Sequence, residues 1–110
     1  MAFRVDITDL ALEDAAEYTG FIRDANKEPE AAERWLHGLV RQILSLEDQP
    51  DRCALIPERH SFGVEIRHLI YFSHRIIFTV DHGRKVVMVY RVYHGSRKRL
   101  RASDLTKLRT

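Results

Sequence analysis

The sequence predicts an α+β fold, in which a helical hairpin packs on a small, mainly antiparallel sheet. Three observations predict this fold. Residues 3–7 alternate apolar and polar side chains, residues 9–47 carry two helical stripes, and residues 64–93 contain three strand patterns. No repeat or low-complexity linker interrupts the 110 residues. We therefore expect a single domain over residues 1–110, with the order β-α-α-β-β-β.

The two predicted helices have clear start signals. Thr8 or Asp9 supplies a short side-chain oxygen that accepts a hydrogen bond from a free N–H in the first turn. Pro29 suits the first position of the second helix, because a backbone N–H would have no helical partner there. The apolar stripe of the second helix runs to about Glu47. A short break at residues 26–28 makes the pair a helical hairpin.

Three strands are predicted at Val64 to Ile70, at residues 75–80 and at Val86 to Tyr93. Between the last two, His82-Gly83 is predicted as a two-residue turn, because glycine adopts a positive φ at little cost. A turn of that length pairs Arg75 with Tyr90 across the hairpin.

This pairing sorts the hairpin's side chains onto two faces. The predicted core face carries Ile76, Phe78, Val80, Val87 and Val89. The other face combines a cation, a phenol and an imidazole with apolar neighbours, and it carries Arg75, Thr79, Tyr90 and His94. Such a combination is either a binding or catalytic site or an ordinary solvated face, and spacing alone leaves both interpretations open.

Charge is distributed unevenly along the chain. The formal net charge is +2, but residues 1–62 hold 7 Lys/Arg and 13 Asp/Glu, a balance of −6. Residues 63–110 hold 11 Lys/Arg and 3 Asp/Glu, a balance of +8. One side of a small domain then attracts polyanions, either nucleic acid or an acidic protein segment.

Several functional classes have no support in the sequence. No apolar run approaches the roughly 20 residues of a membrane span, and the N-terminus lacks the apolar core of a signal peptide, so we expect a cytoplasmic protein. The single Cys53 is interpreted as a small apolar filler. No histidine has the spacing of a metal ligand, and no cofactor is expected.

Three short motifs lie in or next to the predicted strands: EIRHL at residues 65–69, HRIIF at residues 74–78 and VYHGSR at residues 92–97. With the order of elements, they resemble the RelE/ParE superfamily of type II toxin–antitoxin toxins, also called plasmid stabilisation proteins. The resemblance covers essentially the whole chain. It implies a growth-inhibiting toxin that is neutralised by a cognate antitoxin, through an acidic and amphipathic antitoxin segment wrapped over the helices and the sheet.

The superfamily has two functional branches, and the resemblance leaves both open. RelE-like members are ribosome-dependent endoribonucleases that cut mRNA by attack of a ribose 2′-OH on the adjacent phosphate. That chemistry needs a base, an acid and cations that stabilise the charge developing on phosphorus. ParE-like members instead poison DNA gyrase by binding and have no accepted catalytic residues. A degenerate toxin kept only as a binding module is a third interpretation.

If the chain is a nuclease, the resemblance implies four catalytic residues. Arg75 falls on the family's arginine of the central strand, and Arg97 on the arginine after the last strand. Arg67 stands for a basic residue of the preceding strand, and His94 supplies an acid or a base, because an unperturbed imidazole titrates near neutrality. Arginine suits these sites because its planar fork binds phosphate oxygens bidentately.

Two departures from the nuclease pattern favour the ParE-like branch. Glu65 stands where a lysine is expected, and Ser103 stands where a C-terminal tyrosine is expected. The basic run is predicted to bind the target or another polyanion, and it consists of Arg97, Lys98, Arg99 and Arg101. It is equally interpretable as a solubilising tail or an antitoxin contact. Arg75 is alternatively a structural anchor for a carboxylate.

Overall fold

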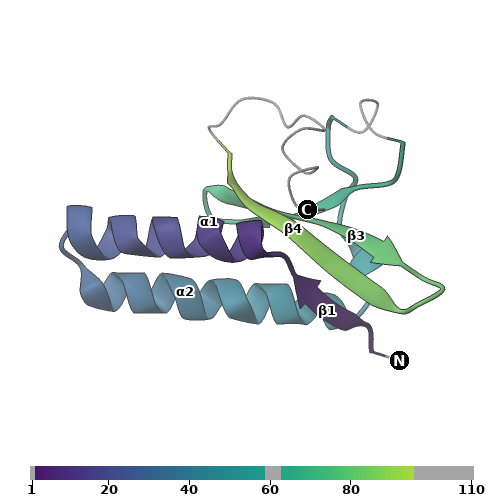
Figure 1. Ribbon diagram of the computed structural model, residues 1–110, viewed down its shortest axis with the longest axis horizontal. Helices are drawn as coiled ribbons and strands as arrows, with labels where there is room; N and C mark the ends of the chain where they lie inside the picture. The colour runs from purple at the N-terminus through teal and green to yellow at the C-terminus, as the bar shows by residue number, and fades with distance from the viewer. Residues whose placement is uncertain (1, 59–62, 96–110) are drawn as a thin grey trace.

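A computed structural model describes residues 2–58 and 63–95, and it shows two helices lying along one face of a four-stranded sheet (Figure 1). In chain order the elements are β1 (Arg4–Ile7), α1 (Asp9–Gly20), the π-helical turn η1 (Phe21–Ala25), α2 (Pro29–Leu44), the 3-10 turns η2 (Ser45–Glu47) and η3 (Pro50–Arg52), β2 (Arg67–Tyr71), β3 (His74–Asp81) and β4 (Val86–His94). The predicted fold class and order of elements are confirmed. Within the described ranges, no helix combines the length and the apolar character needed to cross a bilayer.

The sheet is mixed, with the strand order β1-β4-β3-β2. β1 runs parallel to β4, whereas the pairs β3–β4 and β2–β3 are antiparallel. A parallel pair needs a long crossover connection, and the helical hairpin supplies part of it between β1 and the later strands. β1 therefore lies at one edge of the sheet and β2 at the other.

The predicted start signals of both helices are confirmed. The Thr8 side chain caps α1 by accepting a hydrogen bond from the Ala11 N–H at 3.2 Å. Pro29 is the first residue of α2. On α1, Ala11 and Ala15 are buried. Their small side chains let the helix backbone lie close to the strands, where a larger residue would hold it away.

α1 and its N-cap residue also supply hydrogen-bond partners for the part of β4 that β1 does not reach. Past the end of β1, the Thr8 hydroxyl donates to the Tyr90 carbonyl at 2.8 Å. The Asp14 carboxylate then accepts from the Val92 N–H at 3.0 Å and from the Arg91 guanidinium at 2.7 and 2.9 Å. Backbone groups of a strand edge need partners when they are buried, and here side chains of a helix provide them.

Apolar side chains pack on both faces of the sheet. The larger cluster lies between the helices and the sheet, and its buried members are Ala11, Ala15, Leu39, Ile43, Leu46, Cys53, Tyr71, Ile76, Phe78, Val87, Val89 and Val92. A smaller cluster is formed by Ile56, Ile66, Ile77 and Tyr93. The segment before β2 therefore covers part of the sheet face that the helices leave open.

The predicted two-residue turn between β3 and β4 is wrong. Residues 82–85 form a four-residue turn that pairs Asp81 with Val86. The Asp81 carboxylate accepts a hydrogen bond from the Arg84 N–H at 3.0 Å. Lys85, not Gly83, takes the left-handed conformation, with φ of 56°. This side-chain bond stabilises the four-residue turn.

A bulge on β4 corrects the predicted pairing further. Phe78 pairs with Val89 but Ile77 pairs with Arg91, so Tyr90 is an extra residue on β4. The longer turn alone shifts the register by two residues and keeps the predicted core face, whereas the bulge shifts it by one more. Arg75 therefore pairs with Tyr93 and not with the predicted Tyr90.

β2 begins later than predicted, at Arg67 instead of Val64. The residues before it close a loop: the Ile56 N–H donates to the Ile66 carbonyl at 2.9 Å, and the His68 N–H donates to the Ala54 carbonyl at 3.1 Å. Val64 is exposed. The backbone of this stretch is therefore used to hold residues 54–56 against the edge of the sheet.

The fold leads to one prediction about packing at Gly38. A Cβ built on Gly38 would overlap the Tyr71 hydroxyl and lie 3.1 Å from Cζ of the same ring, which is held by a 2.8 Å hydrogen bond to the Trp35 carbonyl. We expect Gly38→Ala to lower the free energy of unfolding by about 1–3 kcal/mol, measured by thermal or urea unfolding.

Gly20→Ala is the matched control, since its Cβ would meet only ordinary contacts, the nearest at 3.6 Å from Arg23. Alanine is about 1 kcal/mol better than glycine inside a helix, so this variant should be neutral or more stable. Equal stability of the two variants would contradict the proposed contact between Gly38 and Tyr71.

Candidate functional site

Arg75 forms a buried ion pair with Glu58. Its guanidinium donates to both carboxylate oxygens of Glu58, at 3.0 and 2.8 Å. The side chains are only 14% (Arg75) and 6% (Glu58) exposed. β3 supplies the arginine and the segment before β2 supplies the carboxylate. A bidentate pair of this kind fixes the orientation of the guanidinium and neutralises its charge.

Tyr93 extends this cluster across the sheet. The guanidinium carbon of Arg75 lies 5.9 Å from the centroid of the Tyr93 ring, and that of Arg91 lies 5.4 Å from it. Both distances allow a cation–π interaction. Arg91 is itself paired with Asp14 on α1. Two buried ion pairs are therefore linked through one aromatic ring.

His68 is the third polar member of the cluster. Its Nδ1 atom is buried and has no hydrogen-bond partner among residues 2–58 and 63–95. Burial lowers the pKa of His68 below its ordinary value, and the positive charge of Arg75 lowers it further, while Glu58 acts in the opposite direction. Burial and Arg75 therefore both disfavour the protonated form of this imidazole.

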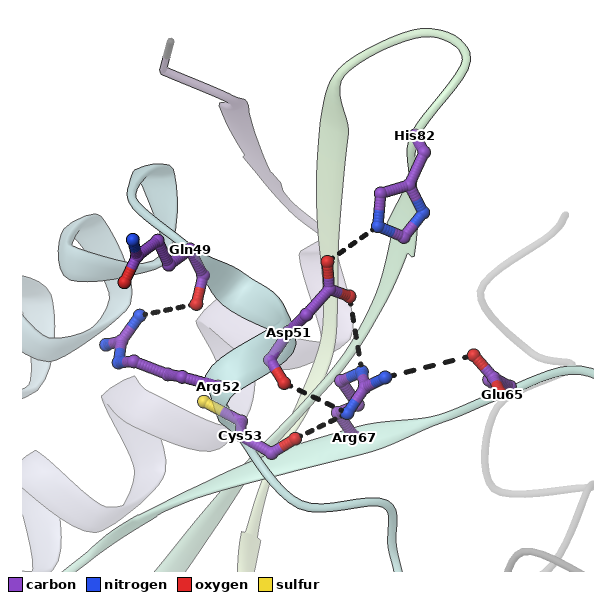
Figure 2. Close-up of polar contacts among 7 residues, drawn as sticks. All are labelled: Gln49, Asp51, Arg52, Cys53, Glu65, Arg67 and His82. Carbon is purple, nitrogen blue, oxygen red and sulfur yellow. Dashed lines mark hydrogen bonds and ion pairs between the residues drawn. The ribbon is translucent and has the colours of Figure 1, made fainter.

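Arg67 has a different environment, shown in Figure 2. Its guanidinium donates to the carbonyl oxygens of Asp51 and Cys53 at 3.3 and 2.6 Å, and it lies 3.6 Å from the Asp51 carboxylate and 3.9 Å from that of Glu65. Arg67 pairs with Phe78 across β2 and β3, so it projects on the opposite face from Arg75. The two arginines do not converge.

The segment that binds Arg67 is itself well anchored. His82 lies 2.7 Å from the second oxygen of the Asp51 carboxylate (Figure 2). Cys53 is buried, and burial raises the pKa of its thiol although Arg52 and Arg67 act in the opposite direction. A protonated, buried thiol agrees with the interpretation of Cys53 as a filler.

His94 lies at the end of β4, and its side chain lies on the sheet face that is covered by α1. It pairs with His74, and the ring centroids are 4.8 Å apart. The two histidines line a cavity of about 440 Å³ together with Asp14, Glu17, Tyr18, Phe21 and Val92. The sequence predicts His94 on the same sheet face as Tyr90 and Arg75. This prediction is wrong, because the bulge at Tyr90 moves His94 to the opposite face.

Four predicted site residues and one departure lie outside the described residues. These are Arg97, Lys98, Arg99 and Arg101, and the departure Ser103. Within the described ranges, no three His, Cys, Asp or Glu side chains are placed to hold a metal ion.

Sequence reasoning missed three residues of the Arg75 cluster: Glu58, His68 and Tyr93. Glu58 lies in an irregular segment 17 residues before Arg75, and no periodicity connects the two. His68 and Tyr93 were detectable only from a correct strand register. His68 pairs with Ile77 and Tyr93 pairs with Arg75.

The ion pair leads to a prediction about stability. Arg75→Ala removes the bidentate guanidinium that pairs with the buried Glu58 carboxylate, so the free energy of unfolding should fall by about 3–5 kcal/mol. Glu58→Ala should cost a similar amount, and the double variant should cost less than the two single changes together. Arg4→Ala is the control, because Arg4 forms an exposed pair with Asp6 and should change stability by less than about 1 kcal/mol. Additive effects in the double variant would contradict coupling between Arg75 and Glu58.

His68 leads to a prediction about pH. Its pKa is lower in the folded than in the unfolded state, so between the two values the unfolded state binds more protons. Stability should therefore fall as the pH is lowered through the ordinary histidine pKa of about 6.5 and continue to fall down to the folded-state pKa. Urea unfolding between neutral and mildly acid pH should show a smaller loss in His68→Gln than in the wild type. Parallel curves would exclude His68 as the cause.

The solved structures that align with this chain include proteins of toxin–antitoxin systems. The chromosomal ParDE system from P. aeruginosa aligns with a TM-score of 0.64 and 19% identity, covering 84% of this chain and 96% of that one. The RelBE2 complex from Mycobacterium tuberculosis aligns with a TM-score of 0.58 and 21% identity, covering 86% and 99%. The archaeal RelE–RelB complex from Pyrococcus horikoshii aligns with a TM-score of 0.51 and 19% identity, covering 88% and 99%. At these identities the likeness shows the fold.

No curated protein matches the chain. A family match decides the assignment that the structural likeness leaves open. Residues 5–99 match the family described as the ParE toxin of the type II toxin–antitoxin system, parDE. The match begins within β1 and extends past the end of β4, so it covers all of the helices and strands described above except Arg4. The chain belongs to the family of ParE toxins of type II toxin–antitoxin systems.

Proposed function

We propose that this toxin acts by binding DNA gyrase, without nuclease chemistry, and that a cognate antitoxin neutralises it. The observation that carries the proposal is the state of Arg75. In the nuclease pattern this arginine would bind the reacting phosphate with its planar fork. Here both oxygens of the Glu58 carboxylate occupy that fork, at 3.0 and 2.8 Å.

The other described cation of the nuclease pattern is also engaged. Arg67 binds main-chain carbonyls and the Asp51 carboxylate on the opposite side of the sheet from Arg75. With Glu65 at the place of an expected lysine and Ser103 at that of a tyrosine, the chain lacks one cation and one proton-transfer group of the pattern. Each such group contributes on the order of a hundredfold or more to rate, so their combined loss favours a binding mechanism.

The proposed partners follow from charge and from the structural neighbours. The neighbours include RelBE2 and RelE–RelB complexes of toxin with antitoxin, and we infer a cognate antitoxin for this chain as well. The +8 balance of residues 63–110 favours an acidic antitoxin segment. We retain Arg97, Lys98, Arg99 and Arg101 as the residues that contact the target. A gyrase inhibitor acts in the cytoplasm, where we expect this chain to work.

A pair of assays on the purified toxin tests the mechanism. We expect it to inhibit supercoiling of relaxed plasmid by DNA gyrase and to leave ribosome-bound mRNA uncut in reconstituted translation. The antitoxin, encoded beside the toxin, should restore supercoiling. Arg97→Ala should weaken inhibition while leaving the melting temperature unchanged.

Specific cuts in ribosome-bound mRNA that disappear in His94→Ala would contradict the proposal and establish the RelE-like alternative. Absence of both activities, with normal growth despite soluble accumulation in bacteria, would favour a degenerate toxin kept as a binding module.

A further inference from the structure

The cavity between α1 and the paired histidines of β3 and β4 has no role in the proposed function. Its volume of about 440 Å³ lies within the range of small-molecule binding sites. The floor of the cavity is buried, since His74 and Val92 are each only 4% exposed. Its rim reaches solvent at Glu17 and at Phe21, which is 51% exposed. A small molecule that enters at the rim therefore reaches a floor that is shielded from water.

The carboxylates in the lining decide which ligand charge this cavity favours. Asp14 and Glu17 line it, and no lysine or arginine of residues 2–58 or 63–95 does. Asp14 also accepts hydrogen bonds from Arg91 and from the Val92 N–H, so its carboxylate is fixed in place. Glu17 places a second carboxylate at the rim. Two carboxylates without a lysine or arginine beside them in the lining favour a cation over an anion.

Two aromatic rings of the same wall attract the same kind of ligand. The ring centroids of Tyr18 and Phe21 are 5.8 Å apart, and the ring planes differ by 31°. The negative face of such a ring attracts a cation within about 6 Å of its centroid, and ammonium groups with several alkyl substituents are bound by aromatic cages in this way. Tyr18 is itself held between Trp35 and His74, with centroid distances of 4.8 and 4.4 Å. The wall is therefore preorganised, which lowers the entropic cost of binding.

We propose that this cavity binds an organic ammonium group. The cation lies against the Tyr18 and Phe21 rings and near the Glu17 carboxylate, and the remainder of the ligand points toward the floor at Val92. A metal ion is the less suitable cation, because within the described ranges no three His, Cys, Asp or Glu side chains are placed to hold one. Free amines and lysine side chains of proteins share this chemistry, and the experiment separates the two sources. Binding at this cavity does not depend on the proposed action on gyrase.

Titrations of the full-length toxin with three probes of similar shape test the site. Choline is the cation, 3,3-dimethylbutan-1-ol is its neutral isostere, and 3,3-dimethylbutyrate is the corresponding anion. Calorimetry should show that choline binds about tenfold more tightly than the neutral isostere. The NMR signals of the His74 and His94 imidazoles should shift as choline binds, because both rings line the cavity.

A fourth probe, Nα-acetyllysine methylamide, separates the two sources of the ammonium group. Weaker binding than that of choline assigns the site to a free amine, and tighter binding assigns it to a lysine side chain of a partner protein. Either order supports the inference as long as the neutral isostere binds more weakly than both.

Two variants test where the cation lies. Glu17→Gln removes the charge at the rim, and Phe21→Leu removes one ring while an apolar side chain remains. Both residues are exposed, so the melting temperature should be unchanged, whereas choline affinity should fall by about three- to tenfold in each variant. Glu13→Gln is the matched control, because it removes the same charge from an exposed position one turn earlier on α1, outside the lining. It should leave the affinity unchanged.

Four results would overturn the inference. Equal binding of choline and the neutral isostere would show that the cavity does not select a cation. Tighter binding of the anion would assign the cavity to protonated histidines. Equal losses in Glu17→Gln and Glu13→Gln would indicate attraction by the general charge of α1. Unchanged imidazole signals at millimolar choline would place any binding elsewhere. None of these results alters the gyrase assay, so failure of this site and failure of the proposed function are distinguishable.

Discussion

The Asp14 carboxylate accepts hydrogen bonds from the edge of β4 where a neighbouring strand would otherwise do so. These bonds connect α1 to the sheet. Beyond the end of β1, the edge of β4 has no strand beside it, and Asp14 binds both its backbone, at the Val92 N–H, and its side chain, at Arg91. A buried charge is tolerated only with such partners. Asp14 also lines the cavity around His74 and His94.

A second buried ion pair lies near the first and also connects distant parts of the chain. Glu58 and Arg75 connect an irregular segment to the centre of the sheet, and Tyr93 lies between this pair and that of Asp14 and Arg91. The positive charge that the sequence concentrates in residues 63–110 is therefore partly neutralised inside the domain. What a partner meets from the described sheet is more apolar than the composition suggests, most of all at Ile70 and Phe72.

Sequence reasoning succeeded where structure is local and failed where it depends on distant residues. The cap at Thr8 and the helix start at Pro29 depend on neighbours within one turn, and both were predictable. The pairing of Arg75 depends on a side-chain bond in the turn and on an extra residue at Tyr90, and neither leaves a periodic signal. The partner of Arg75 was unpredictable for the same reason, since Glu58 lies in a segment without repeating structure.

The bulge at Tyr90 has a consequence for how such toxins diverge. A single residue gained or lost at that point of β4 would exchange the two faces for every side chain between it and His94, while the hydrogen-bonded strand itself remained. Relatives that differ by one residue there would present different chemistry to the same partner without any substitution in the segment. Aligning this part of two family members by residue type alone would then equate side chains that point in opposite directions.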